Sequence, residues 1–342
     1  MNFLTPTDGP GPDMSSGLEH HVRRALSLID LREGSPNRGS ADRDYWWYRT
    51  LTNFSGATWQ QLGWPLALLA SSSSGVVRER LAEASLTCWD WWASIQHSGG
   101  AFDEWYRNER SYCPTAFTSA GACESLHALR AIDRADGQAD CAHILSAIRK
   151  ACGWLEGRWN DQVMNQNLAA ALALQSFSLL DSDPRWTEAA RAKYARIAAN
   201  QDSEGWFGEY RGADFGYSSL SLDLLALADR RGAPEAVSMA EKLAQFLWRV
   251  QWQQPKHPGR LGSRGTTHVF SFGARHFATH DRHAAALANH WSLAEQSADA
   301  AAADDRYFSY FHFPALVLAH LAPVAPVERC SARTMGSDDM SD

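Results

Sequence analysis

Hydrophobic residues recur along most of the chain at the three-to-four-residue spacing of amphipathic helices. In the first half this pattern predicts helices over residues 17–31, 57–72, 76–96, 115–132, 138–157 and 163–180. In the second half it predicts helices over residues 185–200, 217–230, 234–252, 268–279, 282–298 and 307–320. Almost no segment shows the strict alternation of a half-buried strand. The chain is therefore predicted to be all-α, with about twelve helices in about six hairpins.

The predicted helices alternate in character along the chain. Those over 115–132, 163–180 and 217–230 are rich in Ala, Ser and Leu and apolar nearly all round, as buried helices are. Those over 138–157 and 185–200 carry Arg, Lys and Glu along one side. An α/α toroid requires such an alternation of inner and outer helices, and it brings the loops before its inner helices to one end. We therefore expect a six-hairpin α/α toroid over residues 17–322, with a disordered segment at 1–16 and a flexible one at 323–342.

Two glycine-rich, charged segments share one pattern of residues, which is an internal repeat of modest length. The repeated positions, at identical spacing, are Gln96, Gly100, Phe102 and Glu104 in the first copy and Gln201, Gly205, Phe207 and Glu209 in the second. Each copy runs into an apolar segment of small residues, and a third glycine-rich loop covers residues 255–267. We expect the loops at 102–110, 206–217 and 262–268 to line one cavity.

Composition narrows the possible partners. The chain has 342 residues with a net charge of −7, which argues against a nucleic-acid partner. Fifteen tryptophans are an unusual number. Packing along helix seams accounts for more than half of them, but flat aromatic faces also suit sugar rings or cationic hydrocarbon intermediates. The six cysteines form no C-x-x-C pair, so neither a zinc site nor a disulfide framework is indicated, and we expect no cofactor and no metal.

The first residues and the hydropathy bear on location. Residues 1–16 are rich in Pro, Gly and Asp, and lack the basic and apolar regions of a signal peptide. No apolar run reaches the length of a membrane span. We therefore expect a cytoplasmic protein that acts on a small-molecule or oligosaccharide substrate, and the sequence leaves its oligomeric state open.

The sequence Glu-Tyr-Arg-Gly at residues 209–212, followed by Gly-Tyr at 216–217 and an apolar helix, resembles the loop-to-helix element of alginate lyases. These enzymes belong to the alginate and heparin lyase group of α/α-toroid polysaccharide lyases. In that group the preceding hairpin starts with an Asn-His pair before an Ala-rich inner helix, and here Asn-Gln-Asn occupies residues 165–167. The similarity covers residues 165–227. It implies a catalytic set that includes Arg211 and Tyr217.

The resemblance implies a lyase or epimerase acting on a uronate-containing or related oligosaccharide. Such an enzyme neutralises the C5 carboxylate, a role for Asn165 or Asn167 together with Arg211. A base then removes the C5 proton, and Tyr217 returns a proton to the leaving oxygen. Glutamine stands at position 166, where the group has its histidine, and glutamine cannot act as a base. His268 is the best substitute, and Tyr217 serving both roles is the alternative.

Further side chains on the three loops are candidates for binding the substrate. They are Asp103, Glu104, Trp105, Trp206, Glu209, Asp214 and Arg264. Acids from two of the loops could form a glycosidase carboxylate pair, although helix capping and pairing with arginines explain them more simply. Two other function classes stay open. One is a terpenoid-cyclase-like toroid with an aromatic cavity and Asp214 as proton donor, although the chain has no Asp-x-Asp-Asp motif. The other is a non-catalytic toroid that binds a sugar or a partner protein.

Overall fold

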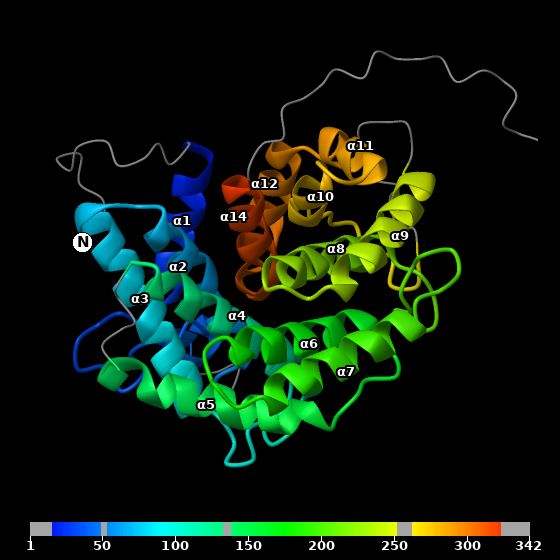
Figure 1. Ribbon diagram of the computed structural model, residues 1–342. Helices are drawn as coiled ribbons and strands as arrows, with labels where there is room; N and C mark the ends of the chain where they lie inside the picture. Colours follow the sequence, from blue (N-terminus) through cyan, green and yellow to red (C-terminus); the bar gives the residue numbers. More distant parts are fainter. Residues whose placement is uncertain (1–15, 49–52, 133–137, 252–261, 323–342) are drawn as a thin grey trace, which may run out of the picture.

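The computed structural model describes residues 16–48, 53–132, 138–251 and 262–322, and most of these residues lie in helices (Figure 1). Within these ranges no strand occurs, and extended pairing is limited to isolated bridges such as Phe102 with Ser111. The all-α prediction is therefore confirmed. In the same ranges no helix has the length and apolar character to cross a membrane. The two terminal segments predicted to be loose lie outside the described residues, except for Ser16.

The first half of the chain contains the α-helices α1 (Ser16–Leu28), α2 (Gly63–Ser71), α3 (Gly75–Ser94), α4 (Tyr112–Arg130), α5 (Gln138–Glu156) and α6 (Met164–Ser178), with the short helices η1 (Asp44–Tyr48) and η2 (Ala57–Leu62) before α2. The second half contains α7 (Arg185–Ala199), α8 (Phe215–Arg230), α9 (Glu235–Val250), α10 (Phe272–Phe277), α11 (Arg282–His290), α12 (Leu293–Ala302), α13 (Asp305–Tyr307), η3 (Phe308–His312) and α14 (Phe313–Leu321). Most bounds lie within a few residues of the prediction.

Two predicted helices are wrong in extent. The helix expected over 282–298 is divided, because Trp291 is extended and the Ser292 hydroxyl accepts the Ala294 N–H to start α12. The helix expected over 268–279 is limited to α10, because the Phe270 N–H donates to the Ser219 hydroxyl on α8 instead of to a helical carbonyl. A polar side chain that offers the backbone another partner ends or starts a helix in both places.

Burial alternates along the chain as the composition predicts. Nearly every residue of α4, α6 and α8 is buried, whereas α7 and α9 bury one side only. The buried helices are neighbours in space: α2 contacts α4, α4 contacts α6, α6 contacts α8 and α8 contacts α10. α10 contacts α14, and α14 contacts α2. The half-exposed helices α3, α5, α7, α9 and α11 each pack on the buried helix next to them in sequence, as the hairpins of Figure 1 show.

The glutamine of the internal repeat makes the same bonds in both copies. The Gln96 side chain donates to the carbonyl of Gly100 (3.0 Å) and to a carbonyl on α5 (2.8 Å). The Gln201 side chain donates to the carbonyl of Gly205 (2.9 Å) and to a carbonyl on α9 (2.9 Å). Both glycines have positive φ, +94° and +97°. The repeat is therefore a structural tie between the loop before a buried helix and the next half-exposed helix.

We expect Gly205→Ala to lower the free energy of unfolding by about 2–4 kcal/mol, through left-handed strain and overpacking. A Cβ at Gly205 would lie 2.2 Å from the carbonyl oxygen of Lys242 on α9. Gly208→Ala is the control in the same loop, because no atom lies within 4 Å of a Cβ built there. Chemical denaturation of both variants measures the difference, and equal midpoints would contradict the expectation.

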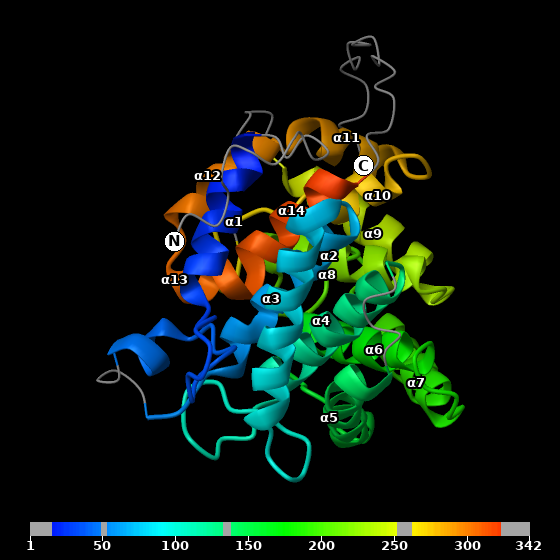
Figure 2. The ribbon, with the colours of Figure 1, turned by 90° about the vertical axis from the view of Figure 1, so that its left-hand side faces the viewer.

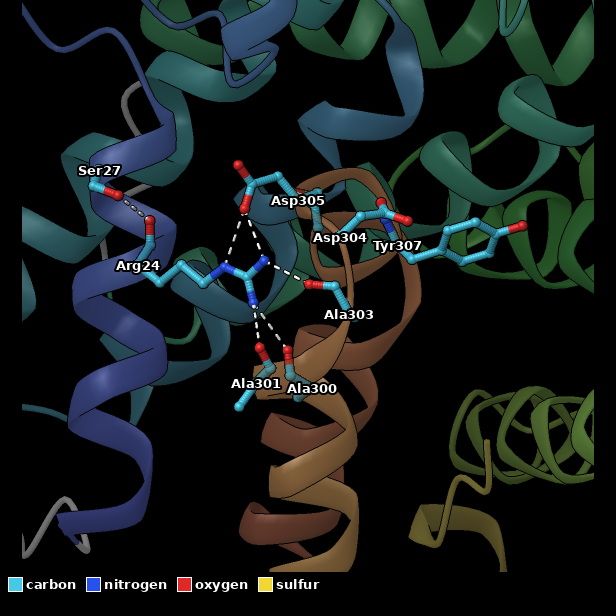
Figure 3. A network of polar contacts seen from close by, with 9 residues as sticks. Arg24, Ser27, Ala300, Ala301, Ala303, Asp304, Asp305 and Tyr307 are labelled. Carbon is cyan, nitrogen blue, oxygen red and sulfur yellow. Dashed lines mark hydrogen bonds and ion pairs between the residues drawn. The ribbon is translucent and has the colours of Figure 1, made fainter. Parts of the chain in front are cut away.

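One arginine ties α1 to the C-terminal part of the chain (Figure 3). The Arg24 guanidinium donates to the Asp305 carboxylate (2.7 and 3.1 Å) and to the carbonyls of Ala300 (3.0 Å) and Ala303 (2.7 Å) at the end of α12. It also lies 4.2 Å from the centroid of the Phe308 ring. A cation at a helix C-terminus satisfies carbonyls that the helix leaves unbonded. Figure 2 shows α1 alongside α12, and this contact fixes the start of α13 and η3, which carry side chains of the site described next.

Candidate functional site

The three loops predicted to line one cavity come directly before the buried helices α4, α8 and α10. The Ser263 N–H donates to the carbonyl of Ala213 (2.9 Å), and its hydroxyl donates to the carbonyl of Glu209, so the second and third loops are bonded to each other. The first loop is tied to α13, because the Arg306 guanidinium lies 2.5 Å from the Glu104 carboxylate. We call residues 102–111, 206–217, 262–268 and 304–312 the loop end.

Tyr217 and His268 lie side by side at the loop end. The Tyr217 ring, in the first turn of α8, is edge-on to the His268 imidazole, with 6.1 Å between centroids. The imidazole also stacks on Phe270 (4.8 Å) and lies edge-on to His312 (5.6 Å). Both Tyr217 and His268 are partly buried. A phenol and an imidazole are therefore held in one partly desolvated place, by aromatic packing from the third loop and η3.

The charges around Tyr217 favour a protonated phenol. Burial raises the pKa of Tyr217 above its usual value, the phenols of Tyr307 and Tyr210 raise it further, and the Arg264 guanidinium lowers it. Arg264 is exposed and lies 4.3 Å from the centroid of the Tyr210 ring. At neutral pH Tyr217 is thus a proton donor, and a cation nearby stabilises the phenolate that remains after donation.

His312 is a neutral neighbour of this pair. Burial lowers the pKa of His312 to about 4, a change that the charge of Asp304 opposes and the charge of Arg24 reinforces. The imidazole of His312 therefore carries no charge at neutral pH. It therefore adds no positive charge beside His268.

The two predicted asparagines lie inside the protein with other partners. Asn165 is only 3% exposed, and its side-chain amide (2.7 Å) and N–H (2.9 Å) both donate to the Glu209 carboxylate. Asn167 is fully buried; its amide donates to the carbonyl of Asn160 (2.7 Å), and its oxygen accepts the Tyr112 hydroxyl (3.0 Å). The structure thus joins them to loops and to α4, and does not place them beside Tyr217.

The two acids of the second loop, Asp214 and Glu209, are buried. Asp214 is the N-cap of α8 and accepts the N–H groups of Tyr217 (3.1 Å) and Arg264 (3.0 Å) and the hydroxyl of Thr266. Glu209 is also fully buried, and burial raises its pKa well above the usual range although hydrogen bonds to the carboxylate oppose this. The capping interpretation is confirmed for Asp214, and the two acids hold loops in place.

Two further predicted binding residues also have local partners. The Asp103 carboxylate accepts the N–H groups of Asn108 (2.8 Å) and Arg110 (2.9 Å), which closes the first loop. The indole N–H of Trp206 donates to Glu204 (3.3 Å), and the ring is partly buried. Both side chains therefore shape their own loops.

Arg211 and Arg264 differ in their relation to Tyr217. Arg211 is exposed on a backbone with φ +76°, and among the described residues it forms no ion pair with Glu209 or Asp214, which are buried with other partners. The charge of Arg264 acts on the Tyr217 phenol. The structure therefore brings together Tyr217, His268 and Arg264, and leaves Arg211 at the rim.

Sequence reasoning did not single out Arg306, Tyr307 or His312 for this site. They follow α12 and lie far along the chain from the loops that they contact. The available signal was the pair of acids at 304–305, because aspartate is a residue type that often caps a helix. Asp304 does so, because its carboxylate accepts the Tyr307 N–H (2.9 Å), and this cap turns Arg306 and Tyr307 toward the loop end.

Comparison with known proteins finds no family model, no curated protein and no solved structure that matches this chain. The interpretation of the site therefore depends on its own geometry and chemistry.

Proposed function

We propose that residues 17–322 form a six-hairpin α/α toroid. The support comes from the helix neighbours: α2, α4, α6, α8, α10 and α14 each contact the next, and α14 contacts α2. The half-exposed helices lie on these buried ones, and α1 and α12 lie beside each other next to α14. In such a ring the loops before the buried helices gather at one end, which agrees with the hydrogen bonds between the second and third loops.

We further propose that the loop end acts on an acidic oligosaccharide as a uronate lyase or epimerase. The observation that carries this proposal is the Tyr217–His268 pair with Arg264 beside it. A phenol that stays protonated, an imidazole and an exposed guanidinium are the acid, the base and the carboxylate-neutralising group that this chemistry requires. Arg264 takes the role that the resemblance assigns to Arg211.

The reaction assigns one step to each group. Arg264 hydrogen-bonds the C5 carboxylate, and it binds more strongly as negative charge develops there. His268 takes the C5 proton, a C4=C5 double bond forms, and the C4–O bond breaks. Tyr217 donates its proton to the leaving oxygen. In an epimerase, Tyr217 instead returns a proton to the opposite face of C5 and no bond to oxygen breaks.

The cyclase alternative loses its predicted acid. Every bond described for the Asp214 carboxylate is one that it accepts, from backbone N–H groups and the Thr266 hydroxyl, and this cap is needed to start α8. The carboxylate is buried and both of its oxygens are occupied by these bonds, so it is not placed to reach a substrate.

The test is to incubate the purified protein with mannuronate, guluronate and galacturonate oligosaccharides in deuterated buffer. Ultraviolet absorbance of an unsaturated product would identify a lyase, and deuterium at C5 without cleavage would identify an epimerase. Binding without either change would support the non-catalytic alternative. Absence of binding, cleavage and exchange with all three series would contradict the proposed substrate class.

A further inference from the structure

Trp105 is an exposed aromatic ring on a firmly held backbone. The residue is 56% exposed. The N–H groups of Trp105 (2.8 Å) and Glu104 (3.0 Å) both donate to the Glu109 carboxylate, which fixes the tip of the first loop. Trp105 shares the loop end with the exposed rings of Tyr210 and Tyr307. Exposed apolar groups that gather in one place mark binding sites more often than single ones do.

The underside of the Trp105 ring is covered by a cation that cannot easily move. The Arg306 guanidinium lies 3.8 Å from the ring centroid. The same guanidinium pairs with Glu104 at 2.5 Å, and the two side chains are only 14% and 10% exposed. A stacked and paired guanidinium keeps its plane. One face of the indole is thus supported from below, and the exposed part of the ring is presented in a fixed orientation.

Two tyrosines link the Trp105 ring and Arg306 to the group formed by Tyr217, His268 and Arg264, which we call the Tyr217 centre. Tyr307 is 39% exposed, its ring lies 5.7 Å from the Arg306 guanidinium, and its phenol acts on the pKa of Tyr217. The charge of Glu104 likewise acts on the pKa of Tyr210, the ring under Arg264. An occupant of the Tyr217 centre that extends toward the first loop therefore meets the Trp105 ring.

We propose that the Trp105 ring, backed by Arg306, is a subsite on which a second sugar ring of the substrate stacks. This inference rests on the proposed function and narrows its substrate: the ligand is an acidic oligosaccharide of at least two rings, not a single uronate. The apolar face of a pyranose packs on the exposed indole, as flat aromatic rings allow. The carboxylate of the reacting ring stays with Arg264, so the charge and the stacking contact recognise different rings.

The experiment compares ligand length by calorimetry with mannuronate monosaccharide and mannuronate hexasaccharide. The unaltered protein should bind the hexasaccharide more tightly, and Trp105→Ala should lower that affinity by roughly five- to tenfold and the monosaccharide affinity by less than about twofold. Tyr106→Ala is the matched control, because its ring is 73% exposed in the same loop and no cation is described over it. It should leave both affinities within about twofold.

Several outcomes would overturn the subsite. They are equal affinity for both ligands in the unaltered protein, an equal loss for both ligands in Trp105→Ala, or a loss in Tyr106→Ala as large as in Trp105→Ala. The proposed reaction is judged separately. If binding depends on ligand length and on Trp105 but no product forms, the reaction is refuted and the subsite is kept. If product forms and Trp105→Ala does not lower its rate at low hexasaccharide concentration, the reaction is kept and the subsite is refuted. If neither the monosaccharide nor the hexasaccharide binds, both the subsite and the proposed reaction are overturned.

Discussion

Tyr217→Phe should lower the turnover of the proposed lyase or epimerase reaction by roughly 10²–10⁴-fold, the usual contribution of a positioned general acid. The substitution removes only the hydroxyl, so the ring can keep its edge-on contact with His268. Substrate affinity should change by less than about threefold, because proton donation stabilises the transition state and not the bound ground state. Initial rates over a range of oligosaccharide concentrations separate the two quantities.

Tyr307→Phe is the matched control for this prediction. Its phenol is near enough to Tyr217 to act on the pKa of that residue, yet it is more exposed, and its ring contacts Phe311. Its turnover should stay within about fivefold of the unaltered protein, since it supplies no proton in the proposed step. Full turnover in Tyr217→Phe, or an equal loss in both variants, would remove Tyr217 from the role of acid.

The helices were predictable because their physical cause is local. The sequence of α6 has almost no charge, and all of its residues from Met164 to Phe177 are buried. The helix after it, α7, carries charges on one side and buries five residues on the other. Such contrasts are visible in composition alone. The break between α11 and α12 was missed, because one serine hydroxyl that accepts a backbone N–H decides it.

The equivalent places of the first and second loops were also predictable, because the repeat puts them at equivalent ends of their hairpins. The partners within the site were not. Glu209 bonds Asn165, 44 positions earlier, and Arg306 bonds Glu104, 202 positions earlier. In the second loop Tyr210 and Arg211 also have positive φ, +53° and +76°, although neither is glycine. Long-range pairing and such backbone angles leave no reliable mark in a single sequence.

The loops of the loop end use their acidic and basic side chains in different ways. Their acids Asp103, Glu109, Glu209 and Asp214 accept backbone N–H groups of the loops and helix starts. Their arginines at 107, 110, 211 and 264 are exposed. Charge that is used internally attracts a ligand less than charge at the surface of a cleft or rim. The loop end is therefore better suited to an anionic ligand than the net charge of the whole chain implies.

Arg264→Lys should lower turnover by roughly tenfold to a thousandfold, as the loss of one positioned donor commonly does. Lysine keeps the positive charge but loses the planar fork that matches a carboxylate, and it stacks less well on Tyr210. The Arg264 N–H is fixed by Asp214 (3.0 Å), so the backbone that carries the side chain should not move. Turnover measured at saturating oligosaccharide reports this loss.

Arg211→Lys is the decisive comparison, because the resemblance to alginate lyases assigns the same role to Arg211. That side chain is exposed at the rim, and it forms no ion pair with Glu209 or Asp214 among the described residues. Turnover should therefore stay within about threefold in Arg211→Lys, as for a solvated surface charge. A large loss in Arg211→Lys with normal turnover in Arg264→Lys would return the role to Arg211. Equal large losses would mean that both guanidiniums hold the carboxylate, and normal turnover in both would exclude a fork-shaped contact with it.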